Sequence, residues 1–335
     1  MAWLRCQTLL FLRLTLLAAL LTPSMGAYAA GVGWEWLSRM NDAVRTQTYT
    51  GTALMRSGDR VETLRIAHRY RQGDEQERIV SLSGERREVL RRDGEVRVLL
   101  PDQGLMIVET DPGRGLLPVL GEAAVQDLDQ HYSVTVLAQS GRVASRATRQ
   151  LRIEPRDNWR WGYMLELDRD TAMPLELRVL GPQGVTLEHV QFVELSMLDM
   201  IADAELESAI DHQKLEVVRA DIAPPDPQQA APFQSWDVAQ PPPGFRLSTR
   251  TWTTLPGLPQ AVAHWVYSDG LATVSIYVSP RNQQVPIPPS QMADGAVSTV
   301  RRYMQDISVT TMGEVPLQTA RRFTQSLGPA AESSR

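Results

Sequence analysis

Short runs of alternating apolar and polar residues, separated by glycine turns, recur between about residue 49 and residue 195, with one interruption over residues 113–129 that is expected to end in a helix. In one of them Leu64 and Ile66 flank Arg65. Period-two alternation puts successive side chains on opposite faces of a strand, so each run predicts a strand with one buried and one wet face. The runs are divided by turn signals such as Ser57-Gly58-Asp59, Gln72-Gly73-Asp74 and Asp93-Gly94. The pattern therefore predicts a large antiparallel meander.

The first 29 residues are predicted to be a secretory signal peptide. Arg5 precedes an apolar run over residues 9–21, and Pro23 ends the run. Ala27-Tyr28-Ala29 then supplies small residues where a signal peptidase reads them, which predicts Ala30 as the new N-terminus. The apolar run is shorter than the roughly 20 residues that span a bilayer. We therefore expect an exported protein.

Export and composition together exclude several classes of function. Cys6 is the only cysteine, and it leaves with the predicted signal, so the exported chain has no disulfide, thiol nucleophile or thiolate metal site. The formal net charge is -5, and losing Arg5 and Arg13 makes it -7. An acidic chain is a poor candidate for nucleic-acid binding, which requires neutralising phosphates.

A proline-rich stretch, residues 223–229, divides the exported chain into two predicted domains. Residues 30–205 are expected to form a large, strongly curved antiparallel sheet with a helix or two on one side. Residues 206–232 are expected to be a linker, and residues 233–329 a smaller α+β domain. The predicted fold class is α+β, mostly antiparallel β.

Local signals predict elements at both ends of this arrangement. Apolar residues at helical spacing predict a short amphipathic helix over residues 34–44. In the second domain, Ser268-Asp269-Gly270 predicts a hairpin turn. Residues 296–303 and 307–311 are expected to be strands, and Pro316 to start a final helix.

No catalytic or metal-binding constellation stands out. The sequence has no Gly-x-Ser-x-Gly elbow, His-Glu-x-x-His motif, P-loop or dinucleotide fingerprint. Its five histidines lack the i, i+3 or i+4 spacing of a ligand pair. We therefore predict a binding protein with no cofactor and no catalytic residue, and we keep an exported hydrolase as a weaker alternative.

The apolar face of the curved sheet is a candidate cavity for an acyl chain. The alternative is a closed core covered by the helices. The candidate lining residues are Leu64, Ile66, Val96, Val98, Met106, Val108, Leu116 and Leu117.

Two further sets of residues are candidate contact surfaces. Arg86, Arg87, Arg91 and Arg92 surround one predicted strand, and arginine's planar fork suits carboxylates and phosphates. The alternative is an ordinary charged outer face. In the second domain the candidate interface residues are Trp252, Trp265 and Tyr267, for which the alternative is a place in the core.

Three segments resemble the MucB/RseB family, in order and over both domains. They are Ser83-Gly84-Glu85-Arg86-Arg87-Glu88-Val89 with Arg92-Asp93-Gly94, Tyr267-Ser268-Asp269-Gly270-Leu271, and Gly313-Glu314-Val315-Pro316-Leu317-Gln318-Thr319-Ala320. The resemblance implies an N-terminal domain like the LolA-type lipoprotein carriers, an unclosed β-barrel, followed by a small α+β domain.

The resemblance also implies a function in the periplasm. Such a protein binds the periplasmic part of a transmembrane anti-sigma factor and shields it from site-1 proteolysis. By this shielding it negatively regulates an envelope-stress sigma factor, and in some members the output is alginate production. Lipid or lipopolysaccharide releases it from the anti-sigma factor. The alternative is a periplasmic lipid or lipoprotein carrier, although a carrier needs only the barrel. The sequence does not decide between a monomer and a homo-oligomer.

Overall fold

The structure is a computed structural model that describes residues 25–110, 125–139, 141–220, 236–253, 261–281 and 288–329. Most of the predicted signal peptide and the pair Leu116 and Leu117 lie outside these residues. None of the described helices is long and apolar enough to cross a membrane.

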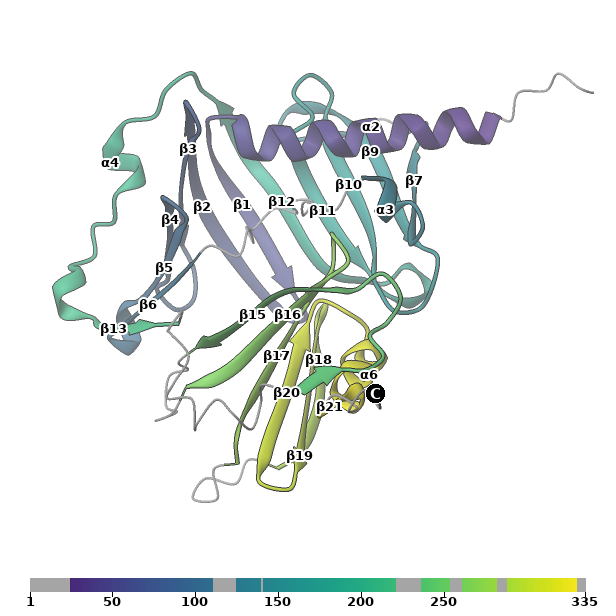
Figure 1. Ribbon diagram of the computed structural model, residues 1–335. Helices are drawn as coiled ribbons and strands as arrows, with labels where there is room; N and C mark the ends of the chain where they lie inside the picture. The colour runs from purple at the N-terminus through teal and green to yellow at the C-terminus, as the bar shows by residue number, and fades with distance from the viewer. Residues whose placement is uncertain are drawn as a thin grey trace, which may run out of the picture.

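One long, open antiparallel sheet dominates the first domain (Figure 1). Its strand order is β13-β6-β5-β4-β3-β2-β1-β12-β11-β10-β9-β7, with β8 paired to β9. The strands are β1 (Tyr49–Ser57), β2 (Arg60–Arg71), β3 (Asp74–Ser81), β4 (Glu88–Arg92), β5 (Glu95–Leu100), β6 (Leu105–Thr110), β7 (Tyr132–Val136), β8 (Arg142–Val143), β9 (Arg146–Pro155), β10 (Gly162–Asp168), β11 (Pro174–Leu180), β12 (Thr186–Met197) and β13 (Glu216–Arg219). The predicted meander and its turns are confirmed, because β1 to β6 pair in chain order.

The helix α2 (Met25–Thr46) lies across one end of this sheet (Figure 1). It is longer than the predicted residues 34–44. Its residues Leu37, Met40 and Val44 recur at helical spacing and are buried in the core of the first domain, together with Tyr132 of β7 and Phe192 of β12. The sequence pattern therefore identified the packed face of the helix, but α2 begins at Met25, nine residues before the predicted start at residue 34.

The segment after β12 does not begin as a free linker. The short helix α4 (Asp203–Leu206), the turn η3 (His212–Lys214) and β13 follow the outer face of the first sheet. Ile210 packs against Leu99, and β13 pairs in parallel with β6. Residues 206–219 of the predicted linker 206–232 thus belong structurally to the first sheet, which its acidic composition did not indicate.

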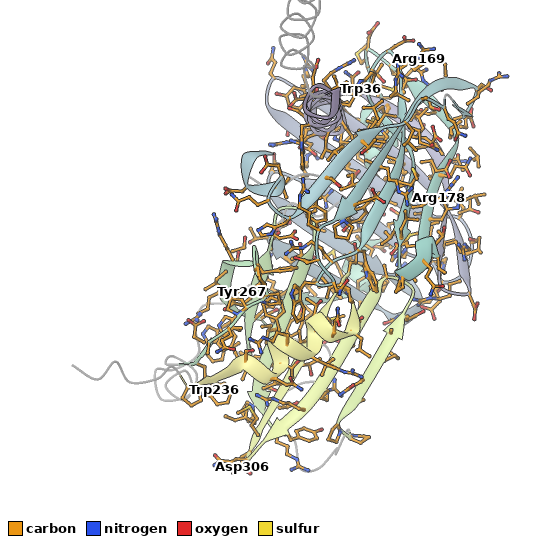
Figure 2. The ribbon with its side chains drawn as sticks, turned by 90° about the vertical axis from the view of Figure 1, so that its right-hand side faces the viewer. Trp36, Arg169, Arg178, Trp236, Tyr267 and Asp306 are labelled. Carbon is orange, nitrogen blue, oxygen red and sulfur yellow. The ribbon has the colours of Figure 1, made fainter. Side chains whose placement is uncertain are left out.

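The second domain packs one helix on a six-stranded sheet. Figure 2 shows the helix α6 (Leu317–Ser326) on the near face of this sheet. The strand order is β15-β16-β17-β20-β19-β18, beside a two-stranded pair β14-β21. The strands are β14 (Trp236–Val238), β15 (Arg246–Thr253), β16 (Val262–Ser268), β17 (Thr273–Pro280), β18 (Ser290–Asp294), β19 (Val297–Met304), β20 (Ile307–Gly313) and β21 (Leu327–Pro329).

The predicted elements of this domain are confirmed. The hairpin turns at Asp269, the two predicted strands are β19 and β20, and Pro316 immediately precedes α6. Phe323 of α6 is fully buried against the sheet. The fold class is therefore as expected: α+β, mostly antiparallel, with an unclosed sheet followed by a small α+β domain.

The shorter remaining elements are α3 (Val125–Leu128), η1 (Pro101–Gln103) and η2 (Pro182–Gly184).

Candidate functional site

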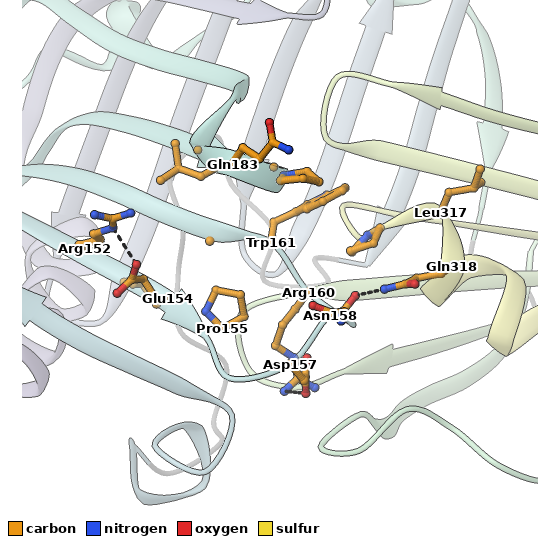
Figure 3. A pocket seen from close by; sticks show the side chains of 17 residues that line it. Arg152, Glu154, Pro155, Asp157, Asn158, Arg160, Trp161, Gln183, Leu317 and Gln318 are labelled. Carbon is orange, nitrogen blue, oxygen red and sulfur yellow. Dashed lines mark hydrogen bonds and ion pairs between the residues drawn. The ribbon is translucent and has the colours of Figure 1, made fainter.

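A groove of about 700 Å³ lies between the two domains (Figure 3). The first domain contributes residues 152–155, 157–158 and 160–162, from the end of β9 to the start of β10, and the turn 180–184. The second domain contributes Pro316, Leu317 and Gln318 at the start of α6. Both domains are therefore needed to form it.

Backbone and side-chain hydrogen bonds fix the loop between β9 and β10 against the second domain. The indole Nε1 of Trp161 donates to the carbonyl oxygen of Ala296 at 2.9 Å. The hydroxyl of Thr319 donates to the carbonyl oxygen of Trp159 at 2.7 Å, and Gln318 donates to that of Asn158. The loop is thus held by the elements that form the opposite wall.

A buried polar cluster lies next to the groove. The Arg160 guanidinium forms an ion pair with Asp269 of the β16–β17 turn, 3.0 Å from Nε to Oδ2, and both side chains are 0% exposed. The hydroxyl of Tyr132 donates to the same carboxylate oxygen at 2.9 Å. Burial, with the Asp269 charge as a further cause, raises the pKa of Tyr132 well above its usual range, so the phenol stays protonated.

The lining of the groove combines apolar and charged side chains. Half-buried Trp161, Leu180 and Leu317 contribute apolar surface. At the rim, exposed Arg152 and Glu154 form an ion pair 3.0 Å apart. A surface that combines apolar side chains with polar and charged ones is typical of a contact with a protein or peptide segment. Among the described residues, no group of three or more His, Cys, Asp or Glu side chains is arranged to hold a metal ion.

Comparison with known proteins identifies the family. Residues 33–210 match the MucB/RseB N-terminal domain, and residues 230–328 match the MucB/RseB C-terminal domain. The chain belongs to the MucB/RseB family.

Individual relatives agree over nearly the whole chain. The chain is 32% identical to the sigma factor AlgU regulatory protein MucB of Pseudomonas aeruginosa over 308 residues, 90% of this chain and 92% of the relative. It is 25% identical to the sigma-E factor regulatory protein RseB of Escherichia coli K12 over 325 residues, 95% and 97% of the two chains.

Solved structures of MucB have the same fold. The crystal structure of MucB in complex with MucA(peri) superposes with a TM-score of 0.68 at 30% identity, covering 89% of this chain and 99% of that one. The crystal structure of MucB by itself gives a TM-score of 0.66 at 29% identity, covering 89% and 98%. The two-domain architecture is thus that of MucB.

The predicted cavity residues of this MucB/RseB chain do not share one face. The register aligns Ile66 with Ile79, Ile79 with Val89 and Val89 with Val98, so these four lie on the inner face of the sheet. Leu64 and Val96 lie on the same face, two residues away on their strands, and both are buried.

Met106 and Val108 lie on the outer face instead. Met106 is paired with Leu99 and Val108 with Arg97. Met106 and Val108 pack in a separate cluster with Leu99 and Ile210. The expectation of one cavity lined by all these residues is therefore wrong for Met106 and Val108, because Leu105-Met106-Ile107-Val108 is a continuous apolar run with no alternation to show which side of β6 points inward.

The four predicted arginines do not form one patch either. Arg86 pairs with Asp102 at 2.6 Å and Arg87 with Glu62 at 2.7 Å, both near the turn after β3. Arg91 points to the inner face, where it forms a buried pair with Glu77 at 2.6 Å.

Arg92 is on the outer face, 60% exposed and 4.0 Å from Asp93. Adjacent residues of a strand face opposite sides, and that separates Arg91 from Arg92.

The predicted interface residues of the second domain are largely core residues. Trp265 and Tyr267 are 1% and 3% exposed and pack in the main cluster of that domain. Trp252 is partly buried against the same cluster. The surface role expected for Trp265 and Tyr267 does not fit this burial, and the core alternative holds for both.

The sequence pattern does not single out most of the residues that build the groove and the polar cluster beside it. Asp269 lies in a segment that carried the family resemblance, and its Asp-Gly turn was read only as a turn. Arg160 and Trp161 have a weaker signal: two tryptophans flank an arginine in the loop between two predicted strands. Nothing in the local pattern connects this loop with the β16–β17 turn.

Proposed function

We propose that this chain is a periplasmic regulator that binds the periplasmic part of a transmembrane anti-sigma factor, shields it from site-1 proteolysis and so restrains an envelope-stress sigma factor. The observation that carries the proposal is the interdomain groove, together with the MucB fold and the complex of MucB with MucA(peri). The relatives of this chain are named as regulatory proteins, which supports a binding protein rather than an enzyme.

The groove is the docking site in this proposal. A peptide segment there would bury apolar side chains against Trp161 and Leu317, while the Arg152–Glu154 pair meets polar groups at the rim. Because the two walls belong to different domains, the affinity depends on how the domains are oriented.

Calorimetric titration of the exported chain, starting at Ala30, with the periplasmic segment of an anti-sigma factor from the same organism tests the proposal. We expect binding of the wild type and at least tenfold weaker binding of Leu317→Arg, which places a charge in the groove. Met292→Arg is the matched control, because Met292 is 60% exposed on β18 and does not line the groove. No binding by the wild type would refute the proposal. Equal losses of affinity in both variants would show that the segment does not bind in the groove.

Release by a lipid or lipopolysaccharide is the regulatory part of the proposal. Acyl chains would enter from the inner face of the first sheet, where Leu64, Ile66 and Val96 lie. A lipid can weaken partner binding only if it favours a state with lower affinity for the partner. Adding lipopolysaccharide micelles to the preformed complex should release the segment and restore its cleavage by the site-1 protease; continued protection would exclude this trigger.

A further inference from the structure

The ion pair between Arg160 and Asp269 joins the two domains at a site with no access to solvent. Arg160 lies in the loop between β9 and β10, and Asp269 lies in the turn between β16 and β17. The two side chains are 0% exposed, with Nε and Oδ2 3.0 Å apart. A charge pair of this kind, far apart in sequence, holds only one relative placement of the two domains.

Asp269 is held rigidly by its own domain. Its Oδ1 accepts hydrogen bonds from the backbone N–H groups of Leu271 at 2.9 Å and Ala272 at 2.7 Å. Its Oδ2 is then directed at the other domain, where it meets Arg160 and the hydroxyl of Tyr132. One carboxylate thus shapes a turn with one oxygen and contacts the neighbouring domain with the other.

Arg160 is surrounded but incompletely hydrogen-bonded. Its Nη2 donates to the carbonyl oxygen of Pro243, and its guanidinium lies over the rings of Tyr132 and Phe245, 5.4 and 5.2 Å from their centroids. Its Nε and Nη1 make no aligned hydrogen bond within the described part of the chain, although Nη1 is 3.2 Å from Asp157.

A buried ion pair with such imperfect geometry gives little net stability, because desolvation of the two charges offsets their attraction. What it does provide is a strong penalty on any arrangement in which one charge stays buried without the other. The pair is therefore suited to select one domain orientation rather than to stabilise the fold.

This orientation also determines the shape of the groove. Asp157, Asn158 and Trp161, the neighbours of Arg160, line one wall, and the residues before and at the start of α6 line the other. A rotation of the second domain about this contact would move Leu317 relative to Trp161 and change the width of the groove.

We propose that Arg160 and Asp269 are a positioning pair that sets the angle between the domains and thereby the partner-binding shape of the groove. The proposal rests on the function proposed above for the groove. Removing one charge should disturb both folding and binding, whereas removing both should restore folding without restoring binding.

The test compares Arg160→Met, Asp269→Asn and the double variant. Asparagine keeps an oxygen acceptor for the turn, so Asp269→Asn removes mainly the charge. Fluorophores at Val193→Cys on β12 and Met292→Cys on β18 report the interdomain distance by single-molecule energy transfer, since both positions are exposed and the exported chain has no other cysteine. The second readout is the affinity for the anti-sigma segment, and the third is the melting temperature.

We expect each single variant to melt earlier and to bind at least tenfold more weakly. The double variant should melt near the wild type, yet show a broadened distance distribution and still bind at least fivefold more weakly. The matched control is Glu77→Gln with Arg91→Met, which removes a buried pair inside the first domain and should leave the distance distribution unchanged.

A double variant with wild-type distances would overturn the proposal, because the pair would then be merely structural. So would a broadened distribution with unchanged affinity, because the groove would not depend on the pair. If the wild type itself bound no segment, the proposed function would fail, and the distance distributions would still decide whether the pair positions the domains.

Discussion

The indole Nε1 of Trp161 donates a hydrogen bond to the backbone carbonyl of Ala296 across the domain boundary, at 2.9 Å. Ala296 is fully buried and packs with the core of the first domain, although it belongs to the turn before β19. The boundary between the domains is therefore a packed and hydrogen-bonded interface, not a flexible joint.

Trp161→Phe should weaken this interface while keeping an aromatic ring in the groove. A typical hydrogen bond contributes about 1 kcal/mol, so we expect the free energy of unfolding to fall by about that amount. Urea denaturation followed by circular dichroism measures the change. An unchanged midpoint would show that water replaces the lost donor at no cost.

Gly244→Ala should destabilise the chain by about 2 kcal/mol, from a positive φ and a steric clash. Gly244 has φ +86°, and a Cβ there would lie 2.4 Å from Nε2 of His131, across the domain boundary. Gly73→Ala is the matched control, because Gly73 has φ +93° and open space around it, so only the backbone strain of about 1 kcal/mol applies. Adding His131→Ala to Gly244→Ala should recover the steric part, and equal losses at both glycines would contradict the clash.

Glu188 should make the chain less stable as pH rises. Burial, with the Glu314 charge as a second cause, raises the pKa of Glu188 from 4.5 to about 7. Between these values the folded state binds more protons than the unfolded state, so the stability present below about pH 4.5 is lost as pH rises through about 7. With solvent screening of this half-buried group, we expect a loss of about 1 to 2 kcal/mol.

Glu188→Gln removes this dependence, because glutamine stays neutral. Its unfolding free energy should exceed that of the wild type by more at pH 8 than at pH 4, because pH 4 lies below the range in which the wild type loses stability. The comparison needs chemical denaturation of both proteins at the two pH values. A constant difference across this range would mean that Glu188 is not the titrating group.

The separated arginines should differ in their effect on stability. Arg91→Met removes the guanidinium that pairs with Glu77, and because the two side chains are only 11% and 9% exposed, the change should cost about 3 kcal/mol. Adding Glu77→Gln should recover most of the lost unfolding free energy. Arg86→Ala should have no measurable effect, because Arg86 is 71% exposed in its pair with Asp102. Equal effects at both positions would argue for the single surface cluster that the sequence suggested.

Local patterns predicted most of the elements but not all. The Asp269 turn and the helix after Pro316 were found because turn residues and helical spacing act over a few neighbours. The strands β15 and β18 were missed. In β18, which reads Ser-Gln-Met-Ala-Asp, all five residues are exposed, so the strand has no buried face to produce alternation. β13 was missed because its pairing with β6 lies outside the local sequence.

The sequence by itself determined most of the strands and the turns between them, the face of α2 that packs and, through three short segments, the family. It did so because alternation, turn chemistry and helical spacing are properties of neighbouring residues. Only the tertiary structure decided which face of β5 and β6 points inward, with which carboxylate each arginine forms an ion pair, and that Asp269 faces Arg160. These depend on register and on the docking of two domains, where burial makes one charge require the other.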